Sequence, residues 1–147
     1  MKKETITRFG NTYYLLGIRK EDDKKVYLKK PTFDCGWYWG IGYVETFRRN
    51  DIHDHQHFDS LFLSHNIYDG FKDYFKEITL DDKEIWTLLE LMQSAYTMRK
   101  YSDMLHSKGA HISSNPLGNL IASDHEYNRI NNIIMPSINN EIEKLLS

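Results

Sequence analysis

The sequence predicts a single α+β domain over residues 1–147, in which a small antiparallel sheet of about three strands packs against two longer C-terminal helices, with short helices between. Three aromatic and branched runs typical of strands occur between Thr12 and Phe47, and helical apolar spacing follows Asn50. No repeat or proline-rich linker divides the chain. With 147 residues, 40% of them hydrophobic, the chain suffices for one core and would be crowded as two domains.

The predicted sheet begins with a hairpin, because TYYLLGI at 12–18 and VYLKK at 26–30 flank the polar segment RKEDDKK. A third run, GWYWGIGYVETF at 36–47, is too aromatic and too interrupted by glycine for a good helix. Side chains alternate along a strand, so the odd positions of this run form a bulky wall and its glycines leave a notch on the other face. The wall comprises Trp37, Trp39, Ile41 and Tyr43.

Helices are predicted beyond Asn50. The segment HFDSLFLSHNIYDGFKDYF at 57–75 is expected to hold one or two short helices, interrupted near Asp69-Gly70. A long helix is expected from a capping box of Thr79 and Asp82 to about His106, and another follows a second such box at Ser123. Pro136 lies inside the last apolar run and is expected to kink or split that helix, because proline lacks the backbone N–H.

Composition excludes several classes of protein. The apolar runs are far shorter than the roughly 20 residues that cross a bilayer, and the start MKKETITRFG lacks an apolar signal core, so we expect a cytoplasmic protein without a membrane partner. The single Cys35 permits neither an internal disulfide nor a zinc ribbon. The phosphate loop GxxxxGK[ST] is missing and GIG is an incomplete dinucleotide fingerprint, so we expect no cofactor.

Charge is unevenly distributed along the chain. Residues 1–30 carry nine Lys/Arg against four Asp/Glu, whereas ten carboxylates between Asp51 and Glu90 meet only three lysines. The acidic region is interpreted either as a face that approaches a basic surface, such as the nucleic-acid channel of another protein, or as solvated surface. The first interpretation assigns Asp69, Asp73 and Asp81 to a partner. A pI near 6.4 argues against direct nucleic-acid binding, apart from local contact through the basic hairpin.

The aromatic wall also has two interpretations. If it is buried, Trp37, Trp39 and Tyr43 form the sheet side of the core. If it is exposed, these residues and the following Arg48 and Arg49 are of the types that dominate binding hot spots, and all five are assigned to partner binding. Stacking on single-stranded nucleic acid is a further version of the exposed interpretation.

A histidine cluster offers the main alternative chemistry. His53, His55 and His57 would project to one side of an extended segment, and neutral imidazole is a common zinc ligand. The cluster departs from the HxHxDH pattern of binuclear metallohydrolases. A small metal-dependent hydrolase or nuclease therefore stands as the alternative function, against a polar loop, structural histidines or an acid-responsive cluster.

Cys35 has both a catalytic and a structural interpretation. It would act as a nucleophile only if His57, His111 or His125 came within hydrogen-bond reach and an Asp or Asn oriented that imidazole. Otherwise a lone cysteine beside an aromatic strand packs as a small buried residue.

Four segments are spread over most of the chain: PTFDCGWYWGIGYVETF, HQHFDSLF, KGAHISSNP and NRINNIIMPSINNEIEKL. Together they resemble a family of small proteins from phages and mobile elements of low-GC Gram-positive bacteria. The resemblance assigns no catalytic or binding residue. It implies a context, because small phage proteins frequently bind and block a host defence complex, including CRISPR effector nucleases. The leading hypothesis is therefore a non-enzymatic protein-binding inhibitor whose partner is a host protein or nucleoprotein complex, and a nucleic-acid-binding regulatory module is a third alternative.

Overall fold

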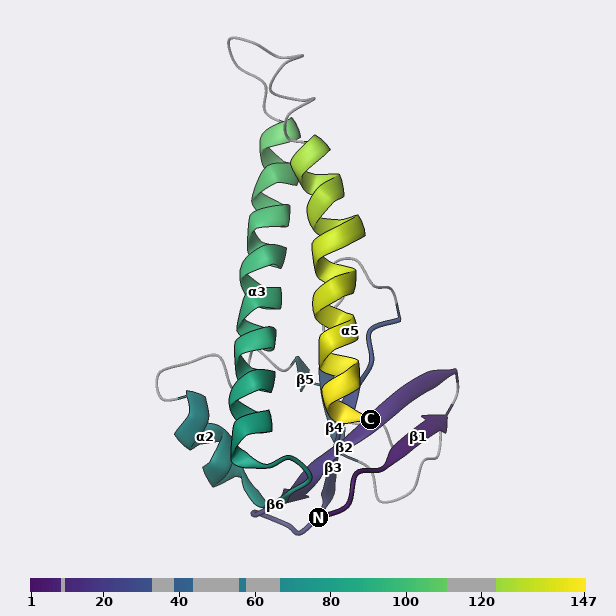
Figure 1. Ribbon diagram of the computed structural model, residues 1–147, viewed down its shortest axis with the longest axis vertical. Helices are drawn as coiled ribbons and strands as arrows, with labels where there is room; N and C mark the ends of the chain where they lie inside the picture. Colours follow the sequence, from purple (N-terminus) through teal and green to yellow (C-terminus); the bar gives the residue numbers. More distant parts are fainter. Residues whose placement is uncertain (9, 33–38, 44–55, 58–66, 111–123) are drawn as a thin grey trace.

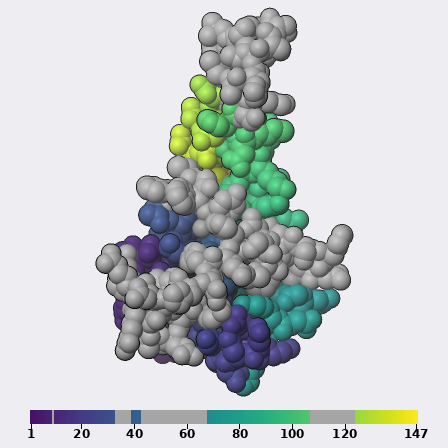
Figure 2. Space-filling view, turned by 180° about the vertical axis from the view of Figure 1, so that it is seen from behind, coloured from purple at the N-terminus to yellow at the C-terminus, as the bar shows by residue number. Residues whose placement is uncertain are grey.

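The structure, a computed structural model, confirms the α+β class, with an antiparallel sheet covered by helices (Figure 1). It describes residues 1–8, 10–32, 39–43, 56–57, 67–110 and 124–147, and the side chains at 43, 56, 57, 67 and 107–110 lie outside this description. Figure 1 shows α3 (Asp82–Ala110) and α5 (Met135–Leu146) side by side, rising from the sheet, with the short helix α2 (Ile67–Tyr74) beside the start of α3. Seen from behind in Figure 2, this helical pair extends well beyond the N-terminal strands.

The sheet has six strands within the described residues, where the sequence predicts about three. Five follow the order β1-β2-β3-β4-β5, each antiparallel to its neighbour, and β6 pairs with β2. The three predicted runs correspond to β2, β3 and β4. The bounds are Thr5–Arg8 (β1), Asn11–Arg19 (β2), Lys25–Lys29 (β3), Gly40–Tyr43 (β4), Gln56–His57 (β5) and Phe75–Ile78 (β6).

Strands β1 and β6 share one edge of β2. β1 pairs with residues 11–14 of β2 and β6 with residues 17–19, while β3 occupies the opposite edge. Thr79 lies where the two meet, because its backbone N–H donates to the Leu16 carbonyl at 2.8 Å and its hydroxyl contacts the Leu15 and Leu16 carbonyls at 2.9 and 3.0 Å. At Gly17 a Cβ atom would lie 2.1 Å from the Glu77 carbonyl oxygen, so only glycine lets β6 approach this closely.

The predicted interruption near Gly70 is wrong, because α2 runs from Ile67 to Tyr74 without a break. Gly70 is exposed there, and one glycine lowers helix stability without ending the helix when tertiary contacts hold the helix in place. The contacts come from Phe71, which is buried, with its ring 4.9 Å from that of Phe75. The predicted helical spacing ends at Phe75, where the chain enters β6.

The N-terminal cap of α3 also differs from its prediction. The capping box consists of Asp81 and Glu84, since the Asp81 carboxylate accepts the Glu84 N–H at 2.8 Å and the Glu84 carboxylate accepts the Asp81 N–H at 3.2 Å. Thr79, the predicted cap, uses its hydroxyl on β2 instead. The proposed second box begins at Ser123, which lies outside the described residues.

Pro136 disturbs the last helix through a local change in winding. Residues 124–129 are α-helical, Ile130–Ile134 form a π-helical turn (η1), and α5 begins at Met135 with the proline in its first turn. The Met135 N–H reaches back to the Ile130 carbonyl, and Pro136 supplies no N–H to continue that pattern. The expected disruption thus takes the form of a π turn.

The main core lies between the sheet and the helices. Tyr14, Leu16, Val26, Leu28 and Ile41 face Phe71 of α2, the apolar stripe of α3, and Ile142 and Leu146 of α5. The apolar stripe of α3 recurs at three- and four-residue spacing and is buried at Ile85, Leu88, Leu89, Met92 and Ala95. A second buried cluster of Tyr13, Leu15 and Tyr27 comes from alternate positions of β2 and β3.

Candidate partner-binding face

The most distinctive exposed surface of the described chain lies where α2 meets the start of α3. We define the α2–α3 face as seven residues, four from α2 and three from α3. Phe71 of α2 and Phe75, the first residue of β6, lie in the core beneath it, and so do Ile85 and Leu89 of α3. Six of the seven side chains of the face are exposed, and Tyr68 is half-buried. The seven residues are Tyr68, Asp69, Lys72, Asp73, Asp82, Trp86 and Glu90.

At the centre of this face two aromatic rings stack. The centroids of Trp86 and Tyr68 are 4.3 Å apart and the ring planes differ by only 5°. Trp86 is nevertheless 52% exposed, the most exposed aromatic residue of the described chain. Because Tyr68 covers one face of the indole, the remaining exposure lies on its opposite face and edges. Exposed tryptophan held in a fixed orientation is typical of interface hot spots.

Polar contacts to Asp82 hold the stacked pair in place. Lys72 Nζ lies 2.6 Å from Asp82 Oδ1, which joins α2 to α3, and the Tyr68 hydroxyl donates to the same carboxylate. These two hydrogen bonds lower the pKa of Asp82, and Asp82 in turn raises the pKa of Lys72. Desolvation and the bond to Asp82 raise the pKa of Tyr68, so its hydroxyl stays protonated and remains a donor at neutral pH.

The flank of the stack is acidic. Asp69 and Asp73 follow Tyr68 and Lys72 by one residue each and occupy the neighbouring exposed strip of α2. Glu90 is exposed one turn after Trp86 on α3. Residues 67–90 contain seven carboxylates and three lysines. Lys72 is engaged by Asp82 and Lys76 by Asp23, which leaves Lys83 as the remaining cation of this segment.

Asp81 has a different role from Asp69 and Asp73, although all three are exposed and were assigned together to a partner. Its carboxylate caps α3 by accepting the Glu84 N–H. Glu84 is held in turn by Lys3, whose Nζ lies 2.8 Å from Glu84 Oε2, and these contacts lower the pKa of Glu84. Asp81 therefore serves the fold, and Asp69 and Asp73 are the better candidates for a partner contact.

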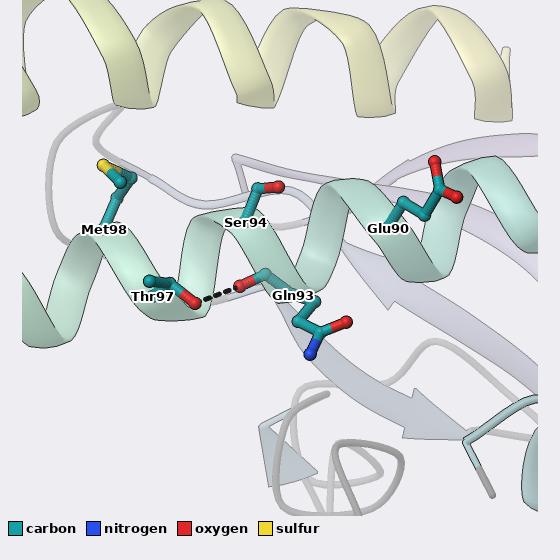
Figure 3. A pocket seen from close by; sticks show the side chains of 5 residues that line it. All are labelled: Glu90, Gln93, Ser94, Thr97 and Met98. Carbon is teal, nitrogen blue, oxygen red and sulfur yellow. Dashed lines mark hydrogen bonds between the residues drawn. The ribbon is translucent and has the colours of Figure 1, made fainter.

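An open hollow continues the exposed strip of α3 beyond Glu90. Figure 3 shows its lining, which includes Glu90, Gln93, Ser94, Thr97 and Met98 from successive turns of α3. The Thr97 hydroxyl donates to the Gln93 carbonyl at 3.0 Å, so it is occupied within the helix. The five residues contribute one carboxylate and no imidazole or thiol.

The aromatic wall of the third predicted strand belongs to the core where it is described. Trp39 is 1% exposed and packs in the main cluster with Ile41, so its assignment to partner binding is corrected. The physical reason is the hydrophobic effect, because a tryptophan ring buried in the core loses more water-exposed apolar surface than a ring left partly exposed on the protein surface. Tyr43 ends β4, but its side chain, like all of Trp37, Arg48 and Arg49, lies outside the described residues.

The proposed metal ligands and nucleophile are almost entirely outside the described residues. His53, His55, Cys35 and His111 fall there, and His57 is described only as a backbone position of β5. Among the residues that are described, no group of three His, Cys, Asp or Glu side chains is placed to hold a metal ion. The histidine and cysteine hypotheses stay predictions.

Sequence reasoning missed Trp86 and Tyr68, although one signal was available. Trp86 falls between Ile85 and Leu88 and so lies off the apolar stripe, on the solvent side of α3. A large aromatic residue out of phase with a helix's buried stripe is a reason to suspect a contact surface. No comparable signal marks Tyr68, because its place depends on how α2 packs against α3.

No family model matches the sequence, and no curated protein or solved structure matches the chain. Within the described residues, none of the helices combines the length and the hydropathy needed to cross a bilayer.

Proposed function

We propose that this protein is a non-enzymatic binding protein that docks its acidic α2–α3 face onto a basic surface of a host defence complex. A guide-loaded CRISPR effector nuclease in the cytoplasm of a Gram-positive host is the partner that the sequence resemblance favours. The observation that carries the proposal is the stacked Trp86–Tyr68 pair, 52% exposed at Trp86 and flanked by Asp69 and Asp73.

The charge arrangement supports a basic partner. Exposed carboxylates on one face create a negative potential that accelerates and orients encounter with a positive surface, and the same carboxylates repel phosphate. Channels that hold nucleic acid are lined by lysine and arginine because they must neutralise a phosphate backbone. A protein that fills such a channel competes with the nucleic acid by presenting carboxylates in its place.

The direct test measures binding to the purified, guide-loaded nuclease with Asp69→Lys/Asp73→Lys. This double reversal is expected to weaken binding about tenfold or more at low salt. The difference from the natural chain should shrink between about 0.1 M and 1 M salt, as the Debye length falls from about 10 Å to about 3 Å. Both sites are exposed, and Asp81 is left unchanged because it caps α3.

A matched control carries the same change in net charge elsewhere. Asp103→Lys/Glu141→Lys alters two exposed carboxylates on α3 and α5, outside the α2–α3 face. This control should bind like the natural chain. The proposal fails if no complex forms with the nuclease, or if both double variants weaken it equally, because the effect would then reflect net charge alone.

A further inference from the structure

The outward face of the Trp86 indole is chemically specific as well as exposed. An indole face carries negative electrostatic potential and attracts cations, most often the planar guanidinium of arginine, which also stacks on the ring. Tyr68 fixes the indole from behind at 4.3 Å, so little conformational entropy is lost when a ligand stacks on the free side.

Carboxylates of neighbouring residues could accept hydrogen bonds from a guanidinium that is stacked on Trp86. Glu90 follows Trp86 by four residues, which places both on one strip of α3 about one turn apart. Helical side chains lean toward the N-terminus, and Figure 3 shows the Glu90 carboxylate extending toward that end of α3. Asp69 and Asp73 add negative charge from α2, whereas Lys83 is the one cation of α3 within a turn of Trp86.

We propose that the Trp86 indole is the anchor for an arginine side chain of the partner, with the guanidinium stacked on the free ring face and hydrogen-bonded to Glu90. This inference rests on the proposed function, since it takes the partner to be a protein with a basic surface. The acidic surroundings favour arginine over a nucleobase, because a nucleotide would bring its phosphate beside these carboxylates.

The test uses short peptides as probes and NMR of the ¹⁵N-labelled full chain as readout. A tetra-arginine peptide is expected to move the indole N–H signal of Trp86 but not that of Trp39, which is buried and bonded to Asn139. A tetra-lysine peptide of equal charge should bind more weakly, because ammonium lacks the planar stacking surface.

Three variants separate stacking from general attraction. Trp86→Leu keeps an apolar side chain but no ring and should weaken tetra-arginine binding about fivefold, whereas Trp86→Phe should retain most of it. Because both variants lack the indole, their binding is measured from the backbone amide signals of α2 and α3. Glu90→Gln removes the hydrogen-bonded charge and should lower the preference for arginine over lysine. Both positions of change, Trp86 and Glu90, are exposed, so the fold is expected to persist.

The inference is overturned if Trp86→Leu binds tetra-arginine as tightly as the natural chain, or if the lysine peptide binds equally well. It is also overturned if a ten-nucleotide oligothymidylate, added without the peptide, moves the Trp86 indole signal as strongly as tetra-arginine does. These results are independent of the nuclease experiment. If the charge-reversed chain loses the nuclease while Trp86→Leu retains it at full affinity, the docking face stands and the arginine anchor falls.

Discussion

Trp39 donates its indole N–H to the side-chain oxygen of Asn139 at 3.0 Å, although the two residues are 100 positions apart in the chain. Both side chains are buried, and the indole also lies 6.3 Å from the Tyr14 ring. The bond ties the start of β4 to the middle of α5 across the main core. An aromatic residue that carries a polar group is thus buried with that group satisfied.

Asn139→Leu is expected to lower the free energy of unfolding by about 1–3 kcal/mol, because it leaves the buried indole N–H without its acceptor. Urea denaturation of the natural chain and the variant measures the difference. Asn140→Leu is the matched control, since Asn140 is exposed on the same helix and should change stability by about 0.5 kcal/mol or less. Equal losses in the two variants would show that the buried bond is unimportant.

Glu143 should make stability depend on pH. Its carboxylate accepts the Tyr14 hydroxyl at 2.7 Å and pairs with Lys30 at 2.9 Å. Partial burial raises the pKa of Glu143, but the hydrogen bonds from Lys30 and Tyr14 outweigh burial and hold that pKa below its ordinary value of 4.5. A lowered folded-state pKa stabilises the fold above the unfolded value, and this stabilisation is lost as pH falls through the folded value.

The corresponding experiment compares the natural chain with Glu143→Gln between about pH 6 and pH 3. The natural chain should be more stable by about 1 kcal/mol near pH 6, and the difference should shrink below pH 4.5 as Glu143 protonates. Subtracting the two curves removes the titration of other groups. A difference that stays constant down to pH 3 would contradict the prediction.

Asp81→Ala should destabilise α3 by about 1 kcal/mol, because the Glu84 N–H loses its capping acceptor. Asp81→Asn retains a capping oxygen and should restore most of the loss. Thermal unfolding of the two variants and of Asp73→Ala, an exposed aspartate with no cap to lose, measures the effect. If Asp73→Ala is as unstable as Asp81→Ala, the capping assignment is wrong.

Two glycines should respond to alanine in opposite directions. Gly17→Ala would place a Cβ atom 2.1 Å from the Glu77 carbonyl oxygen, so β6 must shift, at a cost of about 2 kcal/mol or more. At Gly70 a Cβ meets nothing within 4 Å, and Gly70→Ala should stabilise α2 by roughly 0.5–1 kcal/mol. Denaturation midpoints of the pair provide the check, and a stable Gly17→Ala would refute the close approach of β6.

The fold class could be predicted because the strongest elements carry local signals. β2 alternates between two buried clusters, with Tyr14 and Leu16 in one and Tyr13 and Leu15 in the other, so its apolar run is continuous. The stripe on α3 repeats at three and four residues over more than two turns. Such patterns are visible in sequence because burial imposes them residue by residue.

The missed elements are those whose structure depends on distant partners. β6 has the sequence FKEI, which continues the helical spacing of α2, and it becomes a strand because Gly17 and Ile18 of β2 offer it an open edge. The predicted capping box of α3 began two residues too early for the same reason, because the Thr79 hydroxyl hydrogen-bonds to β2. In the candidate site the acidic charge was predictable from the sequence, whereas the stacking of Trp86 on Tyr68 required the packing of α2 against α3.

The position of α5 has a consequence for synthesis on the ribosome. The strands β1 to β4 come from the first 43 residues, yet the face they offer to the core is completed by Asn139, Ile142 and Leu146. Translation proceeds at about 5–20 residues per second, so this apolar surface stays exposed for several seconds before α5 has been synthesised. The nascent chain is therefore expected to recruit chaperones before release, and it should mature only after translation of α5 is complete.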